Sequence, residues 1–181
     1  MKKSFYLLLL SVLTVFIFTA CNQKTKYEVK IVESIASIEI PTYMSYQDTE
    51  NPEASLEQGN IFKEHYLMLL IESREEISNL GYEFEFTIES YADLILENFD
   101  SSLENSELKK LSKMPKMING MKSLQYEIHG GFPGIEQRIY YFITILESDT
   151  NFYSIFSWCL INDEQKFKSE MKHIAKSLKE I

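Results

Sequence analysis

The sequence predicts an α+β fold, a three-layer α/β/α sandwich around a mostly antiparallel sheet. Three stretches are apolar at nearly every position, which is typical of central strands whose two faces are both covered. Two other stretches repeat apolar residues every three or four positions, which is typical of helices with one buried face. Because these two stretches lie before and after a strand meander, each helix can cover one face of the same sheet.

The residue pattern over positions 34–82 predicts strands joined by polar connections. Ser34–Ile40 is a strand that Pro41 ends, because proline has no backbone donor for a ladder. Ala54–Asn60 is a second candidate strand, and His65–Ile71 is a continuous apolar strand. Ser73–Tyr82 is charged and predicts a flexible connection with at most a helical turn.

Two amphipathic helices follow from the spacing of apolar residues. Thr87–Leu103 is the first, and Thr87 can cap it, with Ser90 as the rival start. Asp163–Ile181 is the closing helix, and Asn162 is its predicted N-cap. Acidic residues at its start and lysines at its end both complement the helix dipole.

Between the two predicted helices, the residue pattern indicates a polar connection followed by a meander of antiparallel strands. Glu104–Lys113 is polar, and Lys116–Leu160 predicts successive antiparallel strands. Asn119-Gly120 favours a tight hairpin turn because both positions tolerate positive φ. A glycine-rich turn lies at Gly130–Gly134. The two central strands of the meander are Gln137–Glu147 and Phe152–Ile161.

The N-terminus has the pattern of an export leader. Lys2 and Lys3 precede the apolar run Tyr6–Phe18, whose thirteen residues are too short for a hydrocarbon core of about 30 Å. A cleaved signal peptide is therefore favoured over an uncleaved membrane anchor, which is the alternative.

Phe18-Thr19-Ala20-Cys21 resembles the lipobox of bacterial lipoproteins, although Phe18 stands where leucine is commonest. The resemblance implies that residues 1–20 are removed and that Cys21 carries two or three acyl chains such as palmitate. Residues 21–30 would then be a lipidated tether, and residues 31–181 a single domain. Several acyl chains make such an anchor effectively permanent, whereas one chain binds only marginally.

Charge argues against binding to polyanions. The leader holds two lysines and no acid, so the mature part carries 16 basic and 27 acidic side chains, a net charge of −11. Arg74 and Arg138 are the two arginines. We therefore expect no basic stripe and no nucleic acid partner. We also expect the acidic domain to stand off an anionic membrane at the end of its tether.

Side chains that carry chemistry are sparse. If Cys21 is lipidated, Cys159 has no partner for an intramolecular disulfide, and its apolar surroundings predict a buried free thiol. His65, His129 and His173 lack the spacing of a metal site, so no metal and no cofactor are expected. His129 beside the glycine turn is the best candidate for a polar site. No nucleophile elbow is present, and the chain is predicted not to be an enzyme.

Tyr43 and Tyr46 are the candidate binding residues. The chain holds many aromatic residues, and most are expected to pack in the core. These two tyrosines instead lie in a predicted loop just after Pro41. We expect both to be exposed and to line one edge of a partner- or ligand-binding groove.

Four segments resemble domains of the Mog1/PsbP-like fold. They are the opening strand and aromatic at Ser34–Tyr43, the helix start at Thr87–Tyr91, the turn at Ile118–Ser123, and the end of the last helix near Ser177–Lys179. The resemblance covers most of the mature chain through short motifs. It implies binding and assembly accessories rather than catalysis, and it supplies no catalytic residues.

The predicted function is therefore a lipid-anchored module of the bacterial cell envelope, on the periplasmic or outer-surface side. Its expected partners are the membrane, through lipid on Cys21, and another envelope protein. One alternative is a carrier of a small apolar ligand in a pocket between sheet and helix. Another is a hydrolase that uses His129 with a distant acid and serine.

Overall fold

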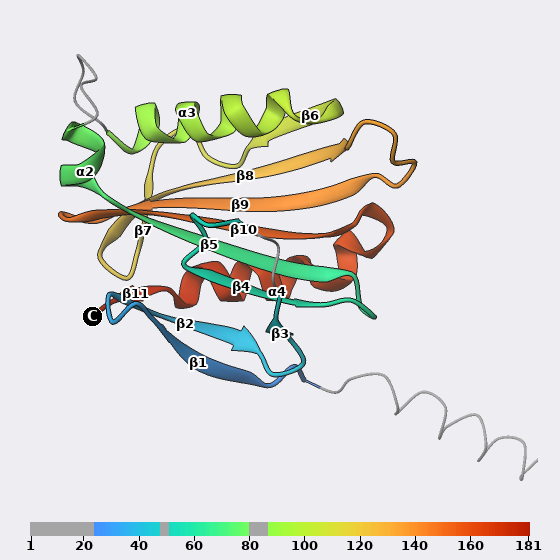
Figure 1. Ribbon diagram of the computed structural model, residues 1–181, viewed down its shortest axis with the longest axis horizontal. Coiled ribbons are helices and arrows are strands. Elements are labelled where there is room, and N and C mark those ends of the chain that lie inside the picture. The colour runs from blue at the N-terminus through green and yellow to red at the C-terminus, as the bar shows by residue number, and fades with distance from the viewer. Residues whose placement is uncertain (1–23, 48–50, 80–86) are drawn as a thin grey trace, which may run out of the picture.

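The computed structural model describes residues 24–47, 51–79 and 87–181 (Figure 1). The predicted signal peptide, residues 1–20, and Cys21 lie outside these described residues. Within them, an eight-stranded sheet with antiparallel ladders forms the middle layer. Its hydrogen-bonded path is β3 (Ser45–Tyr46), β4 (Leu56–Asn60), β5 (His65–Ser73), β10 (Asn151–Leu160), β9 (Ile139–Glu147), β8 (Met121–Gly131) and β6 (Glu104–Lys110), with β7 (Lys116–Ile118) also paired to β8.

Two helices cover the opposite faces of this sheet, as the two-faced apolar strands predict. Helix α3 (Ile88–Ser101) lies on one face, and helix α4 (Glu164–Ser177) lies on the other (Figure 1). The α3 side has its own buried cluster, which includes Tyr91, Ile143 and Phe156. The α4 side has a second cluster, which includes Phe142 and Phe167. The predicted three-layer α+β fold is therefore confirmed.

The layer that holds α4 also contains a small sheet that was not expected. Strands β1 (Tyr27–Val32), β2 (Ala36–Pro41) and β11 (Lys179–Glu180) pair antiparallel in the order β1-β2-β11. Strand β2 matches the predicted opening strand. The prediction of a tether over residues 21–30 is wrong from Tyr27 onward, because β1 already belongs to the fold.

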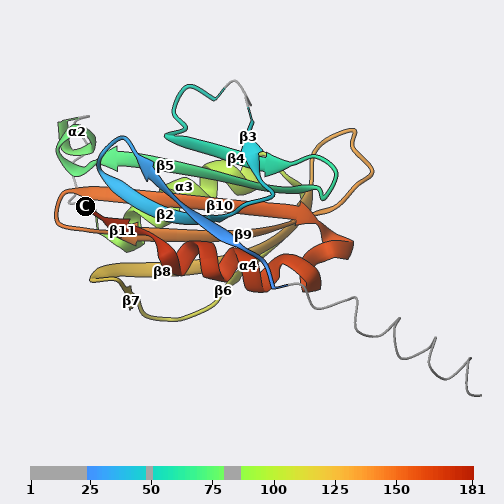
Figure 2. The same ribbon diagram turned by 90° about the horizontal axis from the view of Figure 1, so that it is seen from below.

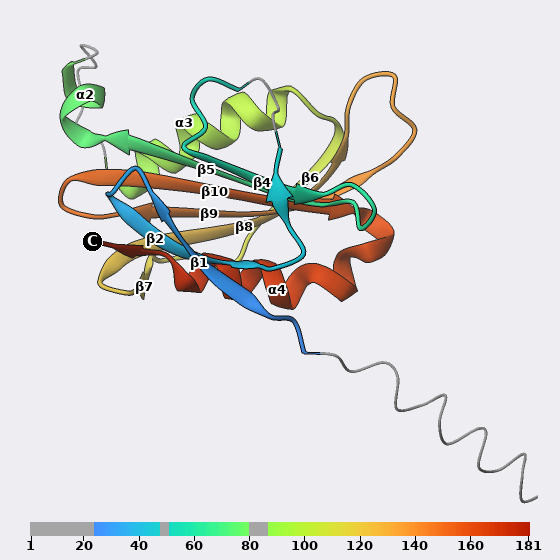
Figure 3. The same cartoon turned by 60° about the horizontal axis from the view of Figure 1, so that its bottom comes forward.

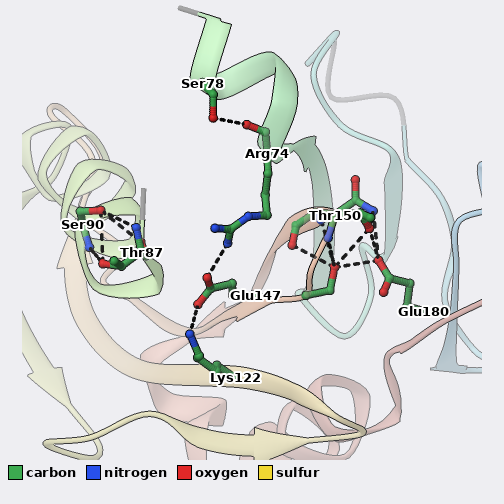
Figure 4. Close-up of polar contacts among 10 residues, drawn as sticks. Arg74, Ser78, Thr87, Ser90, Lys122, Glu147, Thr150 and Glu180 are labelled. Atoms are coloured by element: carbon green, nitrogen blue, oxygen red, sulfur yellow. Dashed lines mark hydrogen bonds and ion pairs between the residues drawn. The ribbon is translucent and has the colours of Figure 1, made fainter. Parts of the chain in front are cut away.

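Helix α3 starts where the sequence predicts. The Thr87 hydroxyl accepts a hydrogen bond from the Ser90 backbone N–H, and the Ser90 hydroxyl accepts one from the Thr87 N–H (Figure 4). This reciprocal capping box satisfies two N–H groups that the helix leaves without partners. The Thr87 cap is therefore confirmed, and Ser90 completes the cap rather than replacing it.

Helix α4 is shorter than predicted. A 3₁₀ turn, η2 (Ile161–Asp163), precedes it, and the backbone becomes extended at Leu178, which leads into β11. Asn162 is therefore not the N-cap; Asp163 occupies that position and makes no side-chain capping bond. The last residues of the predicted helix, Lys179 and Glu180, instead pair with β2.

Two predicted connections contain regular structure. Strand β6 occupies most of Glu104–Lys113, where a polar connection was expected, and it pairs with β8 at the sheet edge. Its side chains are mostly exposed, so no apolar alternation marks it in the sequence. Helix α2 (Arg74–Asn79) occupies part of Ser73–Tyr82, and residues 80–86 lie outside the described residues.

The Asn119-Gly120 turn is confirmed and fixes the end of α4. Both residues have positive φ, 49° at Asn119 and 89° at Gly120. The Asn119 side-chain amide donates hydrogen bonds to the carbonyls of Lys176 at 2.8 Å and Leu178 at 2.7 Å. This hairpin therefore holds the β7–β8 edge against the C-terminal end of α4.

A polar cluster joins the strand ends on the side shown in Figure 4. The buried Glu147 carboxylate forms ion pairs with Arg74 and with Lys122, the latter at 3.2 Å. On β11, the Glu180 carboxylate accepts hydrogen bonds from Thr150 at 2.9 Å and Tyr153 at 2.6 Å. Burial tends to raise the pKa of Glu180, but these and neighbouring hydrogen bonds outweigh burial and lower it.

Candidate functional site: a lysine groove beside α4

A hollow of about 570 Å³ lies between α4 and the sheet edge formed by β6, β7 and β8. Glu127 is the single acidic side chain among the residues that line it. We call this hollow the lysine groove, after the five lysines that line it: Lys109, Lys116, Lys168, Lys172 and Lys176.

Helix α4 supplies one wall of the groove through a simple periodicity. Lys168, Lys172 and Lys176 are four residues apart, so they lie along one side of the helix. The core-facing side of the same helix is formed by Phe167, Met171, Ile174 and Ala175. The lysine stems can therefore lie against apolar surface while their ammonium groups reach solvent.

The strand edge supplies the other wall and the floor. Lys109 projects from β6 and Lys116 from β7. Leu111 and Ile118 are partly buried against the α4-side core, and they give the groove an apolar floor. Met117 is 65% exposed at its rim.

One lysine of the groove is committed to an ion-pair network. The Lys168 ammonium lies 2.9 Å from a Glu127 oxygen and 2.9 Å from a Glu164 oxygen, and Glu164 also contacts His129 Nε2 at 3.0 Å. Burial alone would lower the pKa of Lys168, but its bonds to the two carboxylates raise it. Burial tends to raise the pKa of Glu164, but its bonds to Lys168 and His129 outweigh burial and lower it. Lys168 therefore holds α4 to β8 in its charged form.

Lys116, Lys172 and Lys176 of the groove are free to meet an outside charge. Within the described ranges, no carboxylate lies at ion-pair distance from Lys116, Lys172 or Lys176. Lys172 Nζ lies 6.0 Å from the Phe142 ring centroid, and Lys109 makes a long contact of 3.9 Å with Glu127. A positive surface with few internal counter-charges attracts an anionic ligand.

The expectation that the chain has no basic stripe is therefore wrong. Three of the lysines were visible as an i, i+4, i+8 series in the last helix. Lys109 comes from Glu104–Lys113, where a polar connection was predicted, and Lys116 begins the predicted meander. Pairing of β6 and β7 with β8 brings them opposite α4.

Tyr43 occupies a second polar cluster, which lies under α4 and not on the surface. Its hydroxyl donates to a Glu170 carboxylate oxygen and lies 2.7 Å from His65 Nδ1. Because the hydroxyl proton goes to Glu170, His65 Nδ1 carries the proton of the second bond. Burial, followed by the hydrogen bond to Glu170, raises the pKa of the Tyr43 hydroxyl strongly.

His65 is held neutral in the same cluster. The residue is 0% exposed, its ring stacks on Phe167 at 4.4 Å, and its Nε2 has no hydrogen-bond partner. Burial, with smaller effects of Lys166 and Lys63, lowers the pKa of His65 from 6.5 to about 3. The imidazole is therefore uncharged at neutral pH.

The two candidate binding tyrosines have different environments. Tyr46 is 68% exposed on β3, as expected. Tyr43 is half-buried and bonded on both sides, so the expectation that it is exposed is wrong. The two side chains therefore do not form one exposed edge, and a binding role for the pair stays a prediction.

Cys159 and His129 are the remaining candidates for chemistry among the described residues. The thiol of Cys159 is free and buried, as predicted, and burial followed by Asp163 and Glu164 raises its pKa to about 12. His129 has an acid partner in Glu164. No serine hydroxyl of the described chain is hydrogen-bonded to it. In residues 24–47, 51–79 and 87–181, no group of histidine, cysteine and acidic side chains is arranged to hold a metal ion.

An apolar hollow of about 180 Å³ opens on the α3 side of the sheet. Aromatic rings and one methionine line it: Met68, Phe99, Phe132, Tyr141, Phe156 and Trp158. Phe99 packs edge-on against Tyr141 at 4.9 Å, so the hollow lies between the helix and the sheet.

Among the described helices, none has the length and apolar character that crossing a membrane requires.

Comparison with solved structures shows the fold. No protein-family model matches the chain, and no curated protein matches it. The solution structure of a cyanobacterial PsbP protein, CyanoP from a Synechocystis species, is similar at a TM-score of 0.59 and 10% identity, over 90% of this chain and 98% of that chain. A mutant form of the protein Mog1 is similar at a TM-score of 0.51 and 8% identity, over 87% and 96% of the two chains. The chain therefore has a Mog1/PsbP-like fold, as its four short motifs predicted.

Proposed function

We propose that this chain is a lipid-anchored module of the cell envelope that binds a partner protein, without catalysis, through the lysine groove. The observation that carries the proposal is a basic, apolar-floored groove in a domain whose net charge is −11 without the leader. The leader pattern and the lipobox resemblance at Phe18–Cys21 support the anchor. The Mog1/PsbP-like fold supports an accessory role by analogy alone.

The chemistry of the groove favours an acidic protein segment. Lys116 and Lys176 line opposite walls of the groove and have no ion-pair partner among the described residues, so they can meet carboxylates that approach from solvent. Leu111, Ile118 and Met117 offer apolar contact beneath and beside these charges. A segment that alternates acidic and apolar residues would satisfy both kinds of surface.

A nucleic acid fits the groove less well. The positive charges of the groove are all lysines, which lack the bidentate geometry that arginine offers to phosphate. No aromatic ring lines it on which a base could stack. The acidic remainder of the domain would also repel a long polyanion that extends past the groove.

Charge reversal tests the groove wall by wall. We expect Lys116→Glu and Lys176→Glu each to weaken partner binding on the order of tenfold, because each places a carboxylate opposite the partner's carboxylates. The partner is identified by crosslinking the wild-type protein in its own membrane. Its affinity for each purified variant is then measured at two salt concentrations, and the wild-type affinity should fall at the higher one.

Lys30→Glu is the matched control. Lys30 is a partly exposed lysine of β1 whose ion pair with Glu28 is solvent-accessible, so its reversal applies the same change of charge away from the groove. A glutamate-rich peptide should compete with the partner, and a lysine-rich peptide should not. Equal affinities for the two groove variants and Lys30→Glu would contradict the proposed site.

The apolar hollow on the α3 side supports a second function, the carriage of a small apolar ligand. Its lining is aromatic and its position between sheet and helix is the one expected for such a carrier. Its volume of about 180 Å³ is smaller than the roughly 300 Å³ of ordinary ligand pockets. Partner binding through the larger lysine groove is therefore the preferred function.

A further inference from the structure

The first described residues are already fixed to the fold. The Thr25 hydroxyl donates a hydrogen bond to Glu170 on α4, and the Lys26 carbonyl accepts one from the Thr42 N–H at 2.9 Å. Between Cys21 and Thr25 lie three residues, 22–24. At about 3.3–3.6 Å for each residue step, this link spans at most about 14 Å.

A lipid on Cys21 would therefore hold the domain close to the bilayer. The expectation that the domain stands off the membrane does not agree with so short a link. The part of the surface around Thr25 must face the lipid headgroups, because the link cannot reach around the molecule. Which side chains lie there then decides how the domain meets the membrane.

The β4–β5 turn, residues 61–64, adjoins this attachment point. The same Glu170 carboxylate that binds Thr25 also binds Tyr43. At the end of β4, just before the turn, the Asn60 side-chain amide donates to the Tyr43 carbonyl at 2.8 Å. Within the turn, Lys63 Nζ lies 4.8 Å from the Tyr43 ring centroid. The turn and the start of β1 lie toward the same end of the long axis in two views (Figures 1 and 3).

The turn presents apolar side chains on a rigid backbone. The Asn60 side-chain oxygen accepts hydrogen bonds from the N–H groups of Phe62 at 3.1 Å and Lys63 at 2.9 Å. Phe62 is 92% exposed and Ile61 is 57% exposed, so neither packs in the core. The turn's one acid, Glu64, accepts a hydrogen bond from Tyr66 at 3.0 Å.

We propose that the β4–β5 turn is a membrane-contact site, in which Phe62 and Ile61 enter the interface of the bilayer that holds the lipid on Cys21. Lys63, with Lys24 and Lys26 beside the attachment point, would lie among the headgroups. Exposed aromatic and apolar residues flanked by lysines favour that boundary. The proposal rests on the proposed function, because the lipid brings the turn to the membrane.

Such a contact would leave the lysine groove accessible. Strand β7, which carries Lys116, lies at the other end of the long axis from the β4–β5 turn (Figures 1 and 3). Seen from below, α4 lies between the β1–β2 pair and the β6–β8 edge (Figure 2). The end of the groove that Lys116 lines would therefore lie away from the lipid, where a partner can reach it.

A fluorescent label at position 62 tests the contact. Phe62→Cys gives a single reactive thiol in the lipidated protein, because lipid occupies Cys21 and Cys159 is buried. The variant carries an environment-sensitive dye and is reconstituted into phosphatidylcholine–phosphatidylglycerol vesicles. We expect its emission to shift to the blue and to be quenched by nitroxide-labelled phospholipid. Met117→Cys, a 65% exposed position on β7, is the control and should show neither change.

Two outcomes would overturn the contact and differ in what else they affect. Water-like emission at position 62, in protein that sediments with the vesicles, contradicts the turn contact and leaves the anchor intact. Protein that fails to sediment because Cys21 carries no lipid contradicts the proposed function, and the contact falls with it.

Discussion

Tyr43→Ala is expected to lower the free energy of unfolding by about 3 kcal/mol, whereas Tyr46→Ala should change it by no more than about 0.5 kcal/mol. The first substitution opens a cavity beside His65 at the edge of the α4-side core and removes the hydroxyl that joins His65 to Glu170. It leaves the buried His65 Nδ1 without its partner and removes one of the two hydroxyls that donate to the part-buried Glu170. The second removes a ring that is 68% exposed.

The two variants form a matched pair, since each truncates one tyrosine of the same short segment. For a domain of this size the difference corresponds to a melting temperature lower by roughly 10 °C for Tyr43→Ala. Thermal and urea unfolding of both variants beside the wild type measure it. Similar stabilities for the two variants would show that Tyr43 is not the packing residue described above.

Stability is expected to fall steeply as the pH drops below 6.5, because His65 is buried in its neutral form. The folded-state pKa of His65 is about 3, below the ordinary 6.5 of the unfolded chain. Between these values the unfolded state binds the additional proton, so the free energy of unfolding decreases by about 1.4 kcal/mol for each pH unit of acidification. From pH 6.5 to 4.5 the loss is about 2 to 3 kcal/mol, and above pH 6.5 this effect is absent.

Above pH 4.5, the effect of His65 on stability can be distinguished from that of the carboxylates. Glu164 and Glu180 have pKa values lowered from 4.5, so their contributions are lost only below that pH. His65→Gln removes the titrating group, and we expect its stability to vary much less between pH 6.5 and 4.5, whatever its starting value. Parallel profiles for the variant and the wild type over that range would contradict the assignment.

Hydrophobic patterning made the large sheet and both long helices predictable. Strands β5, β9 and β10 are apolar on both faces because a helix covers each side, and that pattern is local in the sequence. The Thr87 cap and the Asn119-Gly120 turn are local as well. The side chains of β6 are mostly exposed and those of β1 are exposed at half of its positions, and β8 and β2 pair with these two strands. Strand β6 has no apolar alternation in its sequence, whereas Tyr27, Val29 and Ile31 of β1 alternate with Glu28 and Lys30, a strand pattern that the prediction missed.

The candidate site depends on contacts between distant segments. Lys116 and Lys176 are sixty positions apart, and the Asn119 bonds to the carbonyls near the end of α4 bring them together. The Tyr43 hydroxyl finds Glu170 from 127 positions away. Position after a proline predicted an exposed loop tyrosine, because the bonding partners that hold Tyr43 under α4 are distant in the sequence.

The proposed anchor and the membrane contact both depend on lipid at Cys21, and metabolic labelling with a fatty acid tests this most directly. The wild-type chain and Cys21→Ser are expressed in a bacterial host, and label and membrane association are measured for both. We predict label and membrane association for the wild type, and neither label nor cleavage at residue 20 for Cys21→Ser. A wild-type protein that carries no label and is recovered free of membranes would contradict the account.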